Sequence, residues 1–119
     1  MSRAWNTLHD ELLQVRVECE VLGCGAPAAH GHHSLIGRSS KHAKIIDKEI
    51  NWQAACVDCN VTHRVADTYE ALVHAVRLQV GLHGARKVRA YLEEVKKIKP
   101  FSVKTPMRIL EGIENEKSN

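Results

Sequence analysis

The chain has 119 residues, a formal net charge of +3 and a hydrophobic content of 44%. This length suits one domain with a modest core and leaves little room for a second. No apolar run approaches the ~20 residues needed to cross a bilayer, and the first residues lack the apolar segment of a signal peptide, so we expect a cytoplasmic protein with no membrane partner.

Two short strands are predicted after an opening amphipathic helix. Apolar residues recur at helical spacing near the start of the chain, at Trp5, Leu8, Leu12 and Val15. Residues 19–37 are rich in Gly, Ala and His, which favours a tight turn followed by a short strand. A polar, basic loop at residues 38–49 then leads to a second strand at residues 51–55, which enters a helix at Cys56. Trp52 on this strand is predicted to belong to the core.

Two amphipathic helices are predicted in the second half of the chain. The first begins near a capping Asp67, ends near Gly81 and has apolar positions with a 3.6-residue period at Tyr69, Leu72, Val73, Val76 and Val80. The second extends from Gly84 to Ile98, and Pro100 ends it. After Pro100 the periodicity is lost, which predicts a loosely ordered tail over residues 101–119.

The four cysteines form two close pairs, Cys19-x4-Cys24 and Cys56-x2-Cys59. In a reducing compartment such pairs are more often metal ligands than disulfides. Two tight turns that each supply two thiolates can surround Zn²⁺ tetrahedrally, in a closed site that stabilises the fold and does not catalyse. We therefore predict one structural zinc. The alternatives are buried cysteine pairs without metal, or a redox or zinc-storage protein with exposed thiols of low pKa.

Between the cysteine pairs lies the sequence His30-Gly31-His32-His33-Ser34-Leu35-Ile36-Gly37-Arg38, and Asn51 and Cys56-Val57-Asp58-Cys59-Asn60-Val61-Thr62-His63 follow it. The ordered combination resembles the HNH endonucleases, also called ββα-metal or His-Me finger nucleases, in the form that carries a four-cysteine zinc site. The resemblance covers residues 19–63. Residues 32–84 are also similar, over a looser pattern, to the NinG/Rap group of phage recombination endonucleases.

The resemblance implies a metal-dependent DNA endonuclease that leaves 5′-phosphate and 3′-hydroxyl ends. It implies that His33 is the general base, that His32 and Asn60 bind the catalytic metal, and that Asn51 braces the hairpin. Histidine, with an unperturbed pKa of about 6.5, can take a proton from water near neutral pH. Asn60 supplies a hard oxygen ligand, so the expected catalytic ion is Mg²⁺ or Mn²⁺. His63 is a candidate third ligand, because three residues along a helix return to nearly the same face.

Two questions about this site stay open at the level of sequence. The roles of base and ligand can shift by one or two positions within His30 to His33. A non-catalytic module that uses zinc to stabilise a surface for DNA or protein is the alternative to an enzyme. The other histidines are interpreted as ordinary surface or packing residues: His9, His42, His74 and His83.

Basic residues occur in two places that can hold DNA. Arg38, Lys41 and Lys44 lie in the predicted hairpin loop, where they can grip phosphates beside the cut, and Arg38 is also a candidate catalytic residue. The segment from residue 86 to residue 108 carries eight basic and two acidic residues and begins with Arg86, Lys87 and Arg89. We predict that this segment is a second DNA-holding surface that favours branched DNA, which implies a homodimer for paired cuts. The alternative is a solvated helix face.

Together these features predict an α+β fold. It consists of a small ββα-metal hairpin and a zinc knuckle, flanked by an N-terminal helix and two C-terminal amphipathic helices. Residues 1–100 would form a single HNH nuclease domain, with the core motif at residues 19–63 and a helical extension at residues 67–98. The expected substrate is duplex or branched DNA in a bacterial or phage-infected cell, where the protein would act on recombination or replication intermediates or as a phage nicking enzyme.

Overall fold

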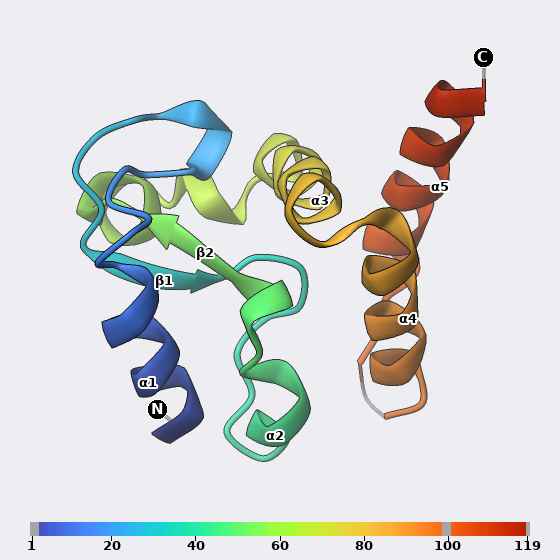
Figure 1. The fold of residues 1–119 in the computed structure, drawn as a ribbon, viewed down its shortest axis with the longest axis horizontal. Coiled ribbons are helices and arrows are strands. Elements are labelled where there is room, and N and C mark those ends of the chain that lie inside the picture. The colour runs from blue at the N-terminus through green and yellow to red at the C-terminus, as the bar shows by residue number, and fades with distance from the viewer. Residues whose placement is uncertain (1–2, 99–100, 119) are drawn as a thin grey trace.

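The structure, a computed structural model, describes residues 3–98 and 101–118. A β-hairpin and the N-terminal helix lie at one end of the molecule, and the C-terminal helices lie at the other (Figure 1). The fold is therefore α+β, which confirms the predicted class. Within the described ranges no helix is long and apolar enough to cross a membrane. In chain order the elements are α1 (Arg3–Leu12), β1 (His30–His33), α2 (Ala43–Ile46), β2 (Trp52–Ala55), α3 (Tyr69–His83), α4 (Ala85–Lys96) and α5 (Lys104–Ser118).

The strands β1 and β2 form an antiparallel hairpin in which His33 lies opposite Trp52 and His32 lies opposite Gln53. Trp52 is completely buried, which confirms its predicted place in the core. Gly31 lies against this indole, because a Cβ atom at residue 31 would be only 2.1 Å from Trp52 Nε1. Glycine at this position therefore permits the close contact between strand and indole.

Helix α1 packs on the hairpin through Trp5, which is only 1% exposed. Leu8 and Leu12 pack beside Trp5 and Trp52 in the same apolar cluster. The helix ends at Leu12, and Val15 is 75% exposed. The prediction that Val15 belongs to the packed face is therefore wrong, because the helical spacing does not continue to this residue.

The caps of helix α3 differ from the predicted ones. Thr68 is the N-cap, and its hydroxyl accepts a hydrogen bond from the backbone N–H of Ala71 at 3.2 Å. Asp67 instead ends a short 3₁₀ turn. Gly84 separates α3 from α4 with a φ of +92°, a conformation that favours glycine, whereas Gly81 lies inside α3. The hydroxyl of Thr68 therefore determines where α3 begins, and the positive φ of Gly84 determines where it ends.

Helix α5 corrects the prediction of a loosely ordered tail over residues 101–119. Residues 104–118 are helical, and the helix packs against α3 and α4. The helix forms because its apolar side chains recur at helical spacing and can pack on one face. Pro106 lies in the first turn, where the missing N–H of proline costs little. The folded unit therefore extends past the predicted boundary at residue 100. The buried residues of this segment are Val103, Pro106, Ile109, Leu110 and Ile113.

The hairpin is joined to the helices by apolar packing and by a buried amide. Leu35, Ile36 and Ile46 of the hairpin loop belong to the core cluster of α3, α4 and α5. Gln79 of α3 is fully buried, and its Nε2 donates to the carbonyl of Trp52 at 2.8 Å and to the hydroxyl of Ser34 at 3.1 Å. A two-stranded hairpin alone is marginally stable in water, so these contacts matter for the shape of the site.

Candidate metal centres and active site

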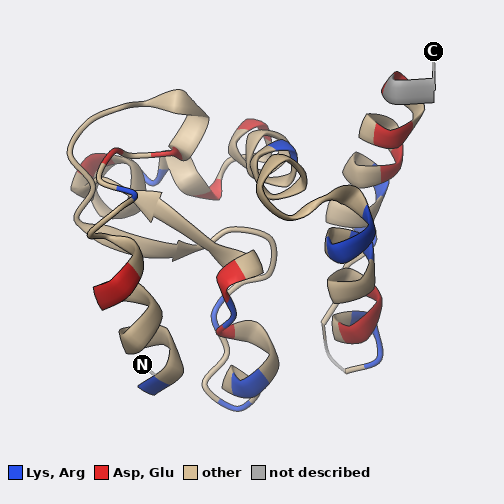
Figure 2. Ribbon diagram, in the orientation of Figure 1, with Lys and Arg blue, Asp and Glu red and all other residues tan. Residues whose placement is uncertain are grey.

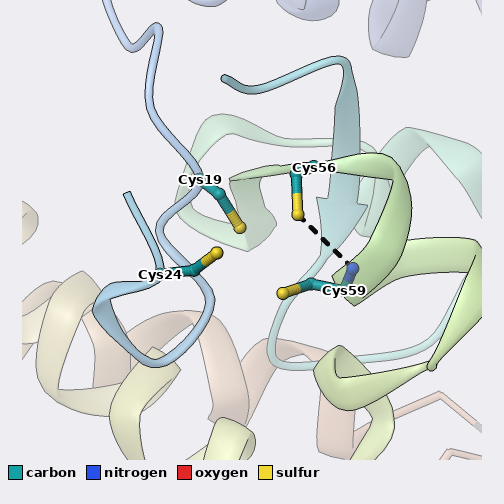
Figure 3. Close-up of side chains that lie close together, drawn as sticks. All are labelled: Cys19, Cys24, Cys56 and Cys59. Carbon is teal, nitrogen blue, oxygen red and sulfur yellow. Dashed lines mark hydrogen bonds between the residues drawn. The ribbon is translucent and has the colours of Figure 1, made fainter. Parts of the chain in front are cut away.

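The four cysteines converge on one point, as the sequence predicts (Figure 3). Their sulfur atoms lie within 4.8 Å of one another, so the cluster can hold a metal ion such as zinc. Thiolates bound to Zn²⁺ at about 2.3 Å lie about 3.8 Å apart in a tetrahedron, which requires only a small contraction of the cluster. The ligands come from two separate turns, with Cys19 and Cys24 before β1 and Cys56 and Cys59 after β2.

The turn between Cys19 and Cys24 depends on left-handed backbone conformations. Gly23 and Gly25 have φ values of +67° and +78°, which glycine adopts without steric cost. The N–H of Gly25 donates to the carbonyl of Cys19 at 2.9 Å, and the N–H of Cys19 donates to the carbonyl of Ala26 at 2.6 Å. These bonds close the turn and direct both thiols inward.

The thiols of the cluster differ in their tendency to ionise. The backbone N–H of Cys59 donates to Cys56 Sγ at 3.4 Å, which lowers the pKa of Cys56 (Figure 3). Burial raises the pKa values of Cys19 and Cys59. Four thiolates this close together repel one another, so they are all ionised at once only when a cation compensates their charge. The donor set therefore fits a zinc-type ion.

A second group of polar residues lies between β1 and the turn that follows β2. His32 Nδ1 is 3.2 Å from Asn60 Oδ1, and both residues line a cavity of about 690 Å³. The two side chains are hydrogen-bonded in the structure, and two ligands at right angles about 2.1 Å from one ion lie about 3.0 Å apart, so a divalent cation could replace this hydrogen bond with little movement. Arg38, Arg64 and Asp67 also line the cavity.

The environment of His32 favours its neutral form. Burial lowers the pKa of His32, and the negative charge of Asp67 and hydrogen bonds to Asn60 and to the backbone of Ala66 oppose the shift only in part. A neutral imidazole keeps a lone pair for a metal, and a bond from the ring to the backbone fixes its orientation. His32 is therefore able to act as a ligand at neutral pH.

His33 also lines the cavity, but its ring is held by different partners. Its Nε2 lies 2.8 Å from Asp47 Oδ1, and its ring stacks on Trp5 with centroids 3.6 Å apart and an interplanar angle of 7°. The side chain is only 8% exposed. Burial lowers the pKa of His33, while the hydrogen bond and charge of Asp47 act in the opposite direction. A neutral ring can accept a proton.

Asn51 makes the bracing contacts that the resemblance implies. Its Oδ1 accepts from the backbone N–H groups of Leu35 and Ile36 at 2.7 and 2.9 Å. Its Nδ2 donates to the carbonyls of Ile36 and Ile46 at 2.9 and 3.0 Å. The completely buried amide thereby ties the start of the hairpin loop to its end. Its catalytic role stays a prediction.

Several candidate residues lie away from the cavity. His63 is exposed and does not line it. His30 also lies outside the cavity lining, whereas His32 and His33 both belong to it. Lys41 and Lys44 are exposed on the hairpin loop, outside the lining.

Three residues at the site occupy positions that the sequence motif does not name. Asp47 contacts His33 from the hairpin loop, and Arg64 and Asp67 line the cavity. Arg64 has a φ of +52°, which is uncommon for a residue with a side chain and can signal a functional constraint. None of the three occupies a position that the motif names, so no sequence signal was available for them.

The positive charge of the basic segment on α4 is partly neutralised by acidic residues of α5. Arg86 and Lys87 are exposed, whereas Arg89 forms an ion pair with Glu114. Arg77 of α3 likewise pairs with Glu116 at 2.8 Å. Acidic and basic positions therefore both occur on the helices at this end of the molecule (Figure 2). Arg89 is therefore less suited to DNA contact than its two neighbours.

The cavity thus brings His32 and its partner Asn60 together with a second histidine, His33. Comparison of the chain with protein-family models, with curated proteins and with solved structures found no match. A functional interpretation therefore depends on the motif residues and their geometry.

Proposed function

We propose that this chain is a metal-dependent DNA endonuclease of the HNH type, which hydrolyses phosphodiester bonds to 5′-phosphate and 3′-hydroxyl ends. The observation that carries the proposal is the His32–Asn60 pair, with 3.2 Å between Nδ1 and Oδ1, in a cavity that His33 also lines. The four-cysteine cluster supports the part of the proposal that concerns a structural zinc. The cysteine pairs, the two histidines and Asn60 occur along the chain in the order that the HNH motif has.

Each residue of the site has a distinct task in this proposal. His32 and Asn60 would hold Mg²⁺ or Mn²⁺, which would supply positive charge beside the phosphate and the leaving oxygen. His33 accepts a proton from the attacking water. Asn51 keeps the hairpin loop closed behind the base through its four hydrogen bonds. Arg38 and Arg64, at the cavity wall, attract the flanking phosphates.

A plasmid assay tests the proposed activity. Zinc-loaded protein is incubated with supercoiled plasmid in Mg²⁺ or Mn²⁺, with an EDTA reaction as control, and the cut ends are mapped by labelling. We expect nicked and linear DNA that depends on the added ion, with 5′-phosphate ends. DNA binding without cleavage in either ion would contradict the proposal and favour a non-catalytic zinc-stabilised module.

Substitution of the ligand pair should change the metal requirement. We expect His32→Ala and Asn60→Ala each to raise the Mg²⁺ or Mn²⁺ concentration for half-maximal cleavage by at least about tenfold, because each removes a direct ligand. Metal titrations of the cleavage rate measure this effect. His63→Ala is the matched control, since that imidazole is exposed and outside the cavity. Equal metal requirements in all three variants would contradict the assignment of the ligands.

Charge reversal on α4 tests the second DNA-holding surface. We propose that Arg86 and Lys87, which are exposed, bind DNA backbone and favour branched substrates. Arg86→Glu combined with Lys87→Glu should weaken binding and reduce the slope of log affinity against log salt by about 1 to 2, since about one counterion is released per contact. Gel shifts at several salt concentrations, with a four-way junction and a linear duplex of equal length, measure both quantities.

Two results would remove this part of the proposal. An unchanged salt slope would mean that the segment is a solvated helix face. Equal affinity of the parent protein for both DNAs would remove the preference for branched substrates and, with it, the reason to expect a homodimer. Lys44→Glu on the hairpin loop is the comparison variant. Loss of a phosphate contact beside the cleavage site should lower the affinity for both DNAs equally.

A further inference from the structure

The carboxylate of Asp47 is a partner of His33 that the motif does not name. Asp47 follows helix α2 in the hairpin loop, where its backbone N–H donates to the carbonyl of Ala43 at 2.8 Å. Its side chain is buried, with 5% exposed, and Oδ1 lies 2.8 Å from His33 Nε2. An ionised carboxylate only accepts hydrogen bonds, so Nε2 carries the proton in this pair.

The proton on Nε2 determines which ring nitrogen can react. A neutral imidazole has one N–H and one lone pair, so the lone pair of His33 lies on Nδ1. Rotation of the ring by half a turn about the Cβ–Cγ bond would put Cε1 in the place of Nε2, and the hydrogen bond to Asp47 would be lost. The indole of Trp5 opposes other ring orientations, because the two rings are stacked at 3.6 Å and nearly parallel. Asp47 and Trp5 therefore restrict both the tautomer and the orientation of this ring.

We propose that Asp47 and Trp5 are positioning residues that hold His33 with its Nδ1 lone pair available to the attacking water. This inference rests on the proposed nuclease function. In the reaction, water loses a proton to Nδ1 as its oxygen bonds to phosphorus, and the bond from phosphorus to the 3′ oxygen breaks, with solvent water supplying the proton to that oxygen. The carboxylate of Asp47 stabilises the imidazolium that forms, as a buried carboxylate does in other acid–base pairs.

The tautomer can be measured without any assay of activity. Protein labelled with ¹⁵N on histidine, zinc-loaded and free of added Mg²⁺, is studied by NMR spectra that correlate ring nitrogens with ring carbon-bound protons. We expect His33 to be in the Nε2–H form, with a downfield Nε2–H proton that exchanges slowly with solvent. In Asp47→Asn this resonance should shift upfield or disappear. A His33 in the Nδ1–H form, or an unchanged resonance in the variant, would overturn the inference.

Kinetics separate a positioning role from a structural one. Asp47→Asn should lower the single-turnover cleavage rate at saturating protein by at least about 100-fold, while the DNA affinity changes by less than about 2-fold. Trp5→Phe retains an aromatic ring and should restore most of the rate that Trp5→Leu loses. Asp10→Asn is the matched control, because Asp10 is exposed on α1, and its cleavage rate should equal that of the parent. Thermal denaturation verifies that each variant is folded.

The failures of the two proposals can be distinguished. If the parent protein cuts DNA and Asp47→Asn cuts at the same rate, the positioning role is overturned and the proposed function stands. If the parent cuts no DNA in Mg²⁺ or Mn²⁺, the proposed function is overturned together with any role in cleavage. The NMR spectrum then still decides whether Asp47 fixes the tautomer of His33.

Discussion

Cys24→Ser should release the metal and lower the midpoint of thermal unfolding by more than about 15 °C, and Cys56→Ser should do the same. Zinc bound by such a site contributes about 10–16 kcal/mol in isolated zinc fingers, which is similar to the whole stability of a typical domain, about 5–15 kcal/mol. Cys24 is exposed and adds little to the apolar core. A large effect at this residue would therefore come from loss of the metal.

The measurements are the zinc content of protein purified without chelator and thermal unfolding followed by circular dichroism. We expect about one zinc per chain in the parent. Val57→Ser is the control, because Val57 is exposed beside Cys56 and outside the cluster. Purified parent protein without zinc and with four freely titratable thiols would contradict the structural site. A normal melting curve for Cys24→Ser would contradict the assignment of that residue as a ligand.

The second large effect is expected for the proposed base. His33→Ala should lower the cleavage rate by about 10² to 10⁴, the usual contribution of acid–base catalysis, and leave the DNA affinity nearly unchanged. The substitution also removes the ring between Trp5 and Asp47 and the hydrogen bond to that buried carboxylate. We therefore expect a loss of about 1–3 kcal/mol in the free energy of unfolding.

Rates should be compared at a temperature where His33→Ala remains folded, with single-turnover kinetics and gel shifts on the same DNA. His30→Ala is the matched control, since it makes the same change on the same strand at a residue outside the cavity. If His30→Ala lost activity and His33→Ala retained it, the assignment of His33 as the base would be wrong.

The local parts of the site could be predicted from the sequence. The spacing of the cysteines predicts one cluster, because each close pair needs only a tight turn. His32 and His33 are the last residues of the first strand, next to the hairpin loop, and Asn51 lies where it can bond to that loop. The residues that make these contacts are close together in the sequence or are brought together by the pairing of the two strands. Their arrangement therefore follows from local structure.

The longer-range parts could not be predicted. Asp47 reaches His33 only because the hairpin loop folds back through α2, and no local pattern reports this path. The spacing from Asn60 predicts His63 on the metal face of an α-helix. The segment Asp58–Thr62 instead forms a π-helical turn, with more residues per turn, and Arg64 then has a left-handed conformation, so the i+3 relation to Asn60 does not apply.

The buried amide of Gln79 has a consequence for the dynamics of the protein. By bonding to Trp52 and Ser34, it joins α3 to the hairpin across a completely buried contact. Opening of the hairpin would leave this amide without those partners inside the core, at a cost of about 1–3 kcal/mol. The backbone amides of β1 and β2 should therefore exchange with deuterium at nearly the same slow rate as those in the middle of α3, as one cooperative unit.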